Sequence, residues 1–325
     1  MESVRKSAGA LLGKLTNSNW GEVRRQLEEL ERENSQLRAA QAARGANRVD
    51  PAKLIWLFCT ARSGSTWLSA MMGEMDGYTR WHEPLVGALF GQLYHNRAAR
   101  RKDEHFILGG DHKRLLDLVR RTVLEGAGRR FPGLADGGYL MVKEPQGSMG
   151  ASLLMEALPE SRMILLVRAP RDVVASNLDA HKKGNWTEEI ARKGGVEKRH
   201  TLADDDPDTF ARMRATRYLK DIGESKQAYE AHEGHKALVR YEDLRSDTLG
   251  AMKRIYTELD LPVDEDHLAR VVEKHDWENI PEQKKGEGKF HRKGTPGGWR
   301  EDLTPEQVEV VEEVTAPILD EFYRT

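Results

Sequence analysis

The sequence predicts a three-layer α/β fold with a central parallel sheet, and three observations lead to this prediction. Short apolar runs lack the polar alternation of a strand that faces water, as expected for parallel strands buried on both faces. Helix-like segments separate these runs. The first run also ends in a glycine-containing turn that leads into a helix, an arrangement that suits anion binding. The expected strands are LIWLF (54–58), YLMVK (139–143), MILLV (163–167) and ALVRY (237–241), and the expected helices are 66–76, 111–126, 148–157 and 209–231.

The composition is that of a globular protein, with 38% hydrophobic and 32% charged residues among 325. A net charge of -2 excludes a globally basic nucleic-acid binder, so we expect no nucleic-acid partner, although the 51 Lys and Arg residues leave room for a local basic patch. The single cysteine, Cys59, excludes an intramolecular disulfide and a cysteine-based metal cluster. No apolar run reaches the roughly 20 residues that span a bilayer, and the N-terminus lacks signal-peptide features. We therefore expect a cytoplasmic protein.

Residues 20–41 form a separate amphipathic segment. Apolar and amide side chains recur there at spacings of three and four, and Asn34 occupies a position where a buried amide pairs with its twin in a parallel dimer. Two interpretations remain open: a coiled coil that makes a homodimer, and a single helix that packs on the main domain. A linker at 43–51 then divides the chain into an N-terminal segment, 1–50, and a main domain, 51–325. The seam consists of Trp20, Val23, Leu27, Leu30, Asn34, Leu37 and Gln41.

Three later segments have distinct local patterns. The polar, glycine-broken stretch 182–208 predicts a mobile loop or lid. Residues 281–298 predict a glycine-rich basic loop. From Thr304 onward the sequence predicts a terminal helix, with Thr304 as N-cap, Pro305 in the first turn and Gln307 completing a capping box.

The turn after the first strand predicts an anion site. Free backbone N–H groups and the positive end of a helix dipole meet at such a turn, and Gly64 lets the backbone approach a ligand closely. Arg62, Ser63, Ser65 and Thr66 add side-chain donors. The alternative is an ordinary strand-to-helix turn, because the full G-x-x-x-x-G-K-[ST] pattern is absent.

Two further basic stretches invite the same interpretation. In MILLVRAPRDVVAS (163–176), Arg168 ends a strand and Ser176 lies in the following helix, where both side chains can reach a second anion. The alternative is that Arg168 merely pairs with Asp172 on the surface. In KFHRKGTPGGWREDLT (289–304), the residues Arg292, Lys293 and Gly294 form a basic loop with little to pair with locally, and a solvated loop is the default for such a run.

The stretches RSGSTW, LLVRAPRDVVAS, VRYEDL and RKGTPGGW occur in this order, and together the chain resembles the sulfotransferases that use 3′-phosphoadenosine 5′-phosphosulfate (PAPS). The resemblance covers about residues 54–305. It implies a P-loop-NTPase-like fold, PAPS as donor, 3′-phosphoadenosine 5′-phosphate (PAP) as product, and no metal. It also implies that Arg62 to Thr66 hold the 5′-phosphosulfate, whereas the 3′-phosphate is held by Arg168, Ser176, Arg292, Lys293 and Gly294.

The same resemblance implies how the adenosine is held. Trp67 matches the position whose ring packs on adenine, and Tyr241 matches the tyrosine of YEDL near the nucleotide. Trp277 stands where cytosolic members usually have a phenylalanine on the other side of adenine. The missing Walker lysine also has a physical reason. That lysine serves a β,γ-phosphate pair with Mg²⁺, which PAPS lacks, whereas an arginine fork suits a singly phosphorylated anion.

The general base departs from the cytosolic pattern. Those enzymes use a histidine in K-x-H, but this chain reads Val142-Lys143-Glu144-Pro145 there. It looks more like tyrosylprotein and bacterial carbohydrate or lipid sulfotransferases, which have a K-[DE]-P segment and a glutamate downstream of the first loop. The segment RWHEP (80–84) then makes Glu83 the candidate base, with His82 as its rival. Lys143 and Arg62 are expected to stabilise charge on the leaving phosphate and the sulfuryl group. Glu144 is expected to be a supporting or surface carboxylate.

Two other function classes remain as alternatives: a non-catalytic nucleotide-binding scaffold and a P-loop kinase. The acceptor is expected to be a hydroxyl of a small molecule, glycan, lipid or peptide, held by segments 84–110 and 177–215. The side chains of interest there are Phe90, Tyr94, Arg97, Arg100, Arg101, Lys182, Lys183 and Trp186.

Overall fold

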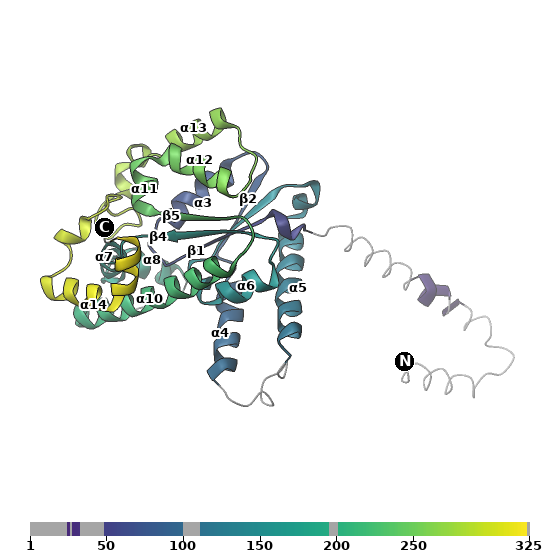
Figure 1. Cartoon of the computed structure of the whole chain (residues 1–325), viewed down its shortest axis with the longest axis horizontal. Coiled ribbons are helices and arrows are strands. Elements are labelled where there is room, and N and C mark those ends of the chain that lie inside the picture. The colour runs from purple at the N-terminus through teal and green to yellow at the C-terminus, as the bar shows by residue number, and fades with distance from the viewer. Residues whose placement is uncertain (1–24, 27, 33–48, 100–110, 195–200, 324–325) are drawn as a thin grey trace. The chain divides into compact units, whose positions relative to one another are not determined.

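The computed structural model describes residues 25–26, 28–32, 49–99, 111–194 and 201–323 (Figure 1). The chain divides into two units, Met1–Arg48 and Val49–Thr325. Of the amphipathic seam expected at 20–41, only Leu30 is among the described residues, where it is exposed in a helical stretch. The homodimer prediction therefore falls almost wholly outside the described residues and stays a prediction.

The second unit is built on a five-stranded parallel sheet with the strand order β2-β3-β1-β4-β5. All four predicted strands are present within one residue of their expected bounds, because uninterrupted apolar runs of this length are typical of buried parallel strands. The edge strand β2 was missed, since YTRWH has alternating burial and resembles a half-exposed segment. The strands are β1 Leu54–Cys59, β2 Tyr78–His82, β3 Tyr139–Lys143, β4 Arg162–Val167 and β5 Lys236–Arg240.

Helices cover both faces of the sheet, which confirms the predicted three-layer α/β fold (Figure 1). Alternate side chains of β1 enter opposite cores: Ile55 and Leu57 pack on one side, and Trp56 and Phe58 on the other. The helices are α3 Ser65–Glu74, α4 Val86–Ala99, α5 His112–Arg130, α6 Ala151–Ala157, α7 Pro170–His181, α8 Trp186–Lys193, α9 Leu202–Asp205, α10 Pro207–Ala231, α11 Tyr241–Ser246, α12 Thr248–Glu258, α13 Glu265–Lys274 and α14 Pro305–Phe322, with short 3₁₀ helices η1 Pro51–Lys53, η3 Pro132–Asp136, η4 Pro145–Gly150, η5 Trp277–Asn279, η6 Glu282–Lys284 and η7 Gly298–Glu301.

The stretch 182–208, predicted as a mobile loop or lid, contains two helices, so the loop prediction is wrong over those residues. Helices α8 and α9 occupy Trp186–Lys193 and Leu202–Asp205, and residues 195–200 lie outside the described part. Glu188 and Glu189 stand in the first turn of α8, and basic residues stand in its last turn, so the charges complement the helix dipole. The polar composition that suggested a loop is the composition of a surface helix.

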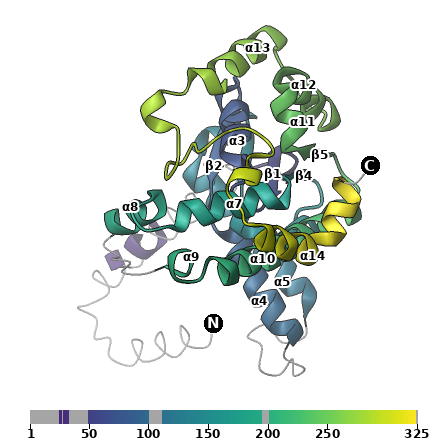
Figure 2. The same ribbon diagram turned by 90° about the vertical axis from the view of Figure 1, so that its left-hand side faces the viewer.

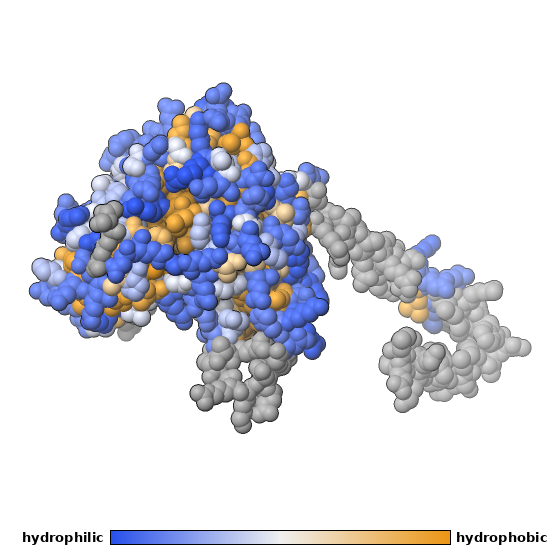
Figure 3. Space-filling view, viewed as in Figure 1, coloured by the Kyte–Doolittle hydropathy of each residue, from blue (hydrophilic) through white to orange (hydrophobic). Residues whose placement is uncertain are grey.

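The terminal helix is confirmed in detail. Thr304 is the N-cap of α14, Pro305 lies in the first turn, and Gln307 completes the capping box. The face shown in Figure 3 is mostly hydrophilic, with scattered apolar patches. None of the helices in the described ranges combines the length and apolarity that crossing a bilayer requires.

Candidate active site

The predicted site residues converge because the sheet is parallel. The carboxyl ends of all five strands lie at one edge of the sheet, and the loops that follow them come together there. The first loop follows β1, Glu83 follows β2, and Lys143 ends β3. Arg168 follows β4 and Tyr241 follows β5. The segment between α13 and α14, which holds Trp277 and Arg292 to Gly294, passes over the same edge (Figure 2).

The first loop presents a row of unpaired backbone donors. Within the described part of the chain, the amide N–H groups of Arg62 to Thr66 donate to no other backbone or side-chain acceptor. Arg62 and Gly64 both have positive φ, of 72° and 89°, so the turn forms a concave nest at the start of α3. A Cβ on Gly64 would lie 2.6 Å from the Tyr241 ring, which explains why glycine is required there. The loop is thus shaped for an anion.

The Arg62 guanidinium links the first loop to the second. Its Nε donates to Ser176 Oγ at 2.9 Å, and its Nη2 donates to the Phe290 carbonyl at 2.7 Å. The rings of Trp186 and Phe290 lie 5.2 and 5.0 Å from the guanidinium. Burial, followed by repulsion from Arg168 and Arg292, lowers the pKa of Arg62 to about 10. Three arginines thus lie close together and partly out of water, which favours an anionic ligand at this place.

Arg168 has a buried donor without a partner. Its Nη1 donates to the Arg62 carbonyl at 2.9 Å and its guanidinium lies 4.3 Å from the centre of the Tyr241 ring. Its Nε is buried and has no acceptor in the described residues. An unpaired buried N–H is unfavourable, and an anion between Arg168 and Ser176 would satisfy it. The alternative pairing of Arg168 with Asp172 is wrong, because Asp172 is buried and accepts hydrogen bonds from two backbone amides.

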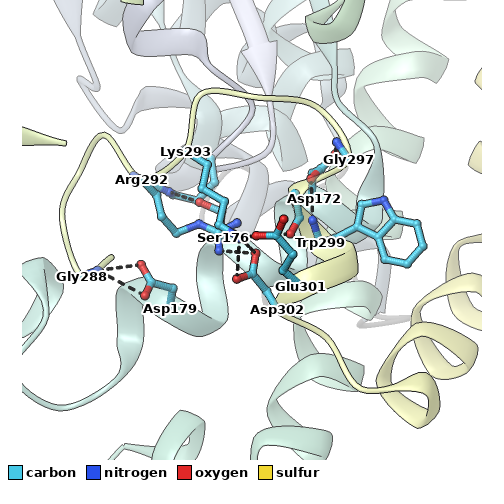
Figure 4. A network of polar contacts seen from close by, with 12 residues as sticks. Asp172, Ser176, Asp179, Gly288, Arg292, Lys293, Gly297, Trp299, Glu301 and Asp302 are labelled. Atoms are coloured by element: carbon cyan, nitrogen blue, oxygen red, sulfur yellow. Dashed lines mark hydrogen bonds and ion pairs between the residues drawn. The ribbon is translucent and has the colours of Figure 1, made fainter. Parts of the chain in front are cut away.

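Those two amides belong to the third basic loop, which α7 fixes in place (Figure 4). Asp172 accepts from Gly297 N at 2.8 Å and from Trp299 N at 3.2 Å. About two turns further along the same face of α7, Asp179 accepts from Gly288 N at 3.1 and 3.2 Å. The sequence interpretation missed both aspartates. Their spacing with Ser176, four residues and then three, was the available signal, because it places all three on one face of a helix.

The expectation that Arg292 and Lys293 have little to pair with locally was wrong. Arg292 Nη1 donates to Asp302 Oδ2 at 2.5 Å, and Lys293 Nζ contacts Glu301 at 2.7 Å and Asp302 at 3.0 Å. The turn of η7 brings these carboxylates back under the basic residues, as Figure 4 shows. Local acids therefore hold the two cations at the edge of the site.

The remaining predicted nucleotide residues lie around Tyr241. Its hydroxyl donates to the Gly294 carbonyl at 3.1 Å, and Trp67 meets its ring edge-on at a centroid distance of 6.3 Å. Trp67 Nε1 donates to the His275 carbonyl at 2.9 Å. A Cβ on Gly294, whose φ is 65°, would lie 2.4 Å from the Trp277 ring. Two tryptophans and a tyrosine thus lie together at one end of the site.

The other end holds the candidate base. Lys143 is only 2% exposed, and its Nζ donates to Glu83 Oε1 and, at 3.2 Å, to Thr66 Oγ1. The Glu83 side chain is 30% exposed, so one side of the carboxylate remains open to an incoming ligand. His82 Nε2 lies 3.8 Å from Glu83 Oε1. Burial and then Lys143 lower the pKa of His82. The surface alternative for Glu144 is excluded, because that residue is 1% exposed.

The chain is similar to one protein family and to several solved structures. The family described as "Sulfotransferase domain" matches residues 53–323. A mouse sulfotransferase, SULT7A1, solved with PAP, has 14% identity and a TM-score of 0.51 over 83% of this chain and 85% of its own. Sulfotransferase STF9 from Mycobacterium avium has 16% identity and a TM-score of 0.49 over 84% and 77% of the two chains. Retinol dehydratase, solved with androsterone and PAP, has 17% identity and a TM-score of 0.47 over 84% and 82%.

No curated protein matches the chain. The family match covers most of the second unit and includes all four motifs from which the resemblance was inferred. The structural likeness to the mouse enzyme supports the same fold. The chain belongs to the sulfotransferase-domain family.

Proposed function

We propose that this protein transfers the sulfuryl group of PAPS to a hydroxyl group of an acceptor and releases PAP. The observation that supports this most strongly is the row of five unpaired amides in the first loop, with Arg62 and Lys143 beside it. A nest of this kind at a helix N-terminus suits the phosphosulfate end of the donor. Membership of the sulfotransferase family supports the same donor.

The second anion site fits the 3′-phosphate. Arg168 offers its unpaired Nε, and Arg62, which bonds Ser176, lies close enough to Arg168 and Arg292 for both to lower its pKa. The aromatic end, with Trp67, Tyr241 and Trp277, fits an adenine between rings. Under this proposal Arg62 contacts the 5′-phosphate, and its hydrogen bond to Ser176 ties the two anion sites together.

In the proposed reaction Glu83 removes the proton from the acceptor hydroxyl as its oxygen attacks sulfur in line. The new oxygen–sulfur bond forms while the bond between sulfur and the 5′-phosphate oxygen breaks, and PAP leaves with the electron pair. Lys143 and Arg62 stabilise the charge on that oxygen. Lys143 already bonds both Glu83 and Thr66, so it holds the base beside the first loop.

The proposed acceptor is defined less narrowly than the proposed donor. Exposed Leu85 and Leu89 follow Glu83 along the chain, and Trp186 lies beside Arg62, so apolar surface is present near the open side of the base. Arg100 and Arg101 of the expected acceptor segment, and the side chain of Arg97, lie outside the described residues. The proposed acceptor is therefore a hydroxyl group. A screen of small molecules, glycans, lipids and peptides with labelled PAPS would determine which class carries it.

The first experiment is a thermal-shift titration without Mg²⁺. We expect PAP to raise Tm in proportion to ln(1 + [PAP]/Kd), and ATP to have little effect. We expect Arg168→Ala to weaken PAP binding about 10- to 100-fold, because a charged hydrogen-bond donor to phosphate is lost. Arg120→Ala is the matched control, since Arg120 of α5 pairs with Glu160, away from the loops of the site.

Selective stabilisation by ATP and Mg²⁺ would overturn the proposal in favour of a kinase. PAP binding without any transfer from labelled PAPS across the acceptor screen would favour the nucleotide-binding scaffold.

A further inference from the structure

The turn that carries Glu83 has a backbone conformation that needs support. Glu83 has φ 49° and Leu85 has φ 63°, so two residues with side chains adopt the left-handed region. Each costs about 1–2 kcal/mol relative to the right-handed region. Such residues keep this conformation only where neighbouring groups hold them. The groups that hold residues 83–85 therefore determine where the Glu83 carboxylate lies.

One such group is the side chain of Glu144, which is 1% exposed directly after β3. Its Oε1 accepts from Val86 N at 3.2 Å and its Oε2 accepts from Gly87 N at 3.1 Å. These are the first two amides of α4, which have no acceptor within the helix. A carboxylate there also lies at the positive end of the α4 dipole. Glu144 thus ties β3 to the residues that immediately follow the Glu83 turn.

The backbone packs closely around Glu144 because glycines stand at the points of contact. A Cβ on Gly147 would lie 1.8 Å from Glu144 Oε2, and a Cβ on Gly87 would lie 2.3 Å from the Gly147 carbonyl. A Cβ on Gly150 would lie 2.3 Å from the Gly87 carbonyl. Helix α4 and the 3₁₀ helix η4 therefore touch backbone to backbone around the carboxylate. This close approach leaves little freedom for the N-terminus of α4.

The other end of the turn is held by the preceding residue of β3. Glu83 N donates to the Lys143 carbonyl at 2.9 Å, and Lys143 Nζ bonds the Glu83 carboxylate. Glu144 N in turn donates to the Leu57 carbonyl at 3.1 Å, which fixes this pair to β1. Two consecutive residues of one chain segment thus hold both ends of the turn.

We propose that Glu144 is a positioning residue for sulfuryl transfer, which sets the Glu83 carboxylate by holding the first two amides of α4. The inference rests on the proposed function, because it takes Glu83 as the base. Glu144 does not contact the donor or the acceptor. Its removal displaces Glu83 while the nucleotide loops, which follow β1, β4 and β5, keep their contacts.

The test compares Glu144→Gln and Glu144→Asp with the wild type in transfer from PAPS. Gln has the same shape but loses one acceptor, and Asp keeps the charge but is one methylene too short to reach both amides. We expect kcat to fall about 10- to 100-fold in both variants, because a displacement of about 1 Å at the reacting group has this effect. KM for PAPS and the Tm shift caused by PAP stay as in the wild type. Glu156→Gln, an exposed carboxylate paired with His112, is the control that keeps full activity.

Unchanged kcat in Glu144→Gln and Glu144→Asp overturns the proposal. So does a loss of PAP binding and of kcat together, because Glu144 would then support the fold in general and not the base. If the wild type itself transfers no sulfuryl group from PAPS, the proposed function fails first, and that result is distinct from both.

Discussion

At Lys143 a buried ammonium joins the candidate base to the first anion loop. Its Nζ bonds Glu83 on one side and Thr66 on the other, and its side chain is almost wholly removed from water. A buried cation needs a partner, so the Lys143–Glu83 contact stabilises the fold in addition to its proposed part in the reaction. The same contact distinguishes Glu83 from its neighbour His82, whose side chain is 51% exposed.

The two candidate bases can be separated by substitution. In Glu83→Gln the isosteric amide cannot remove a proton, so we expect kcat to fall about 10²- to 10⁴-fold with PAP affinity within about twofold of the wild type. In His82→Gln we expect kcat within about threefold of the wild type, because the half-exposed imidazole lies 3.8 Å from Glu83 Oε1, beyond hydrogen-bond distance. Steady-state kinetics with labelled PAPS measures both. The reverse pattern would assign the base to His82.

At the scale of elements, two helix N-termini and one helix face organise the site at the carboxyl edge of the sheet. The start of α3 provides the unpaired amides, the start of α4 positions the Glu83 turn, and Asp172 and Asp179 on one face of α7 hold the third basic loop. The α7 contacts use backbone amides of the loop. The α7 carboxylates therefore hold the loop through its backbone, in addition to the contacts of its own side chains with Glu301 and Asp302.

The shape of the first loop gives a prediction at this scale. Gly64→Ala places a methyl 2.6 Å from the Tyr241 ring, at a φ of 89°. We expect PAP affinity to fall more than about tenfold, or about 1.4 kcal/mol, because the new methyl group pushes the Tyr241 ring away from the first loop. Gly137→Ala is the matched control, since its φ is 101° with open space around it.

Both variants should lose about 1 kcal/mol of folding stability from backbone strain, as measured by chemical denaturation. Only Gly64→Ala should lose PAP affinity in calorimetric titration. Equal PAP affinity in the two variants would show that the close contact with Tyr241 does not shape the site.

At the scale of the whole molecule, Glu144 makes stability depend on pH. Burial raises the pKa of its carboxyl from 4.5 to about 7, despite the hydrogen bonds from α4 that lower it. Between these values the folded protein binds a proton that the unfolded chain releases. The free energy of unfolding therefore falls as pH rises from about 4.5 to 7. Above pH 7 the contribution of Glu144 no longer changes with pH.

Glu144→Gln removes this dependence. We expect the free energy of unfolding of the variant, relative to the wild type, to increase by about 3 kcal/mol between pH 4.5 and pH 8. Urea denaturation at several pH values measures the difference. A difference that stays constant with pH would show that Glu144 titrates near its ordinary value in the folded protein.

Much of the fold was predictable because its strongest signals are local. Apolar runs marked β1, β3, β4 and β5, and the capping box marked the start of α14. The edge strand β2 and helix α8 were missed, since their half-polar patterns do not differ from those of loops. The burial that stabilises both elements comes from neighbours distant in the sequence.

The sequence by itself determined which residues bear the positive charge and the hydrogen-bond donors, and the order in which four motifs supply them. Only the tertiary structure decided which of these residues meet. Arg62 bonds Ser176 from 114 residues away, and Lys143 joins Glu83 and Thr66 because the strand order puts β3 between β2 and β1. Local periodicity specifies an element and its buried face, whereas strand order depends on the packing of the whole domain. For that reason the contact between Lys143 and Glu83, and the contacts of Glu144 with the start of α4, became visible only in the folded chain.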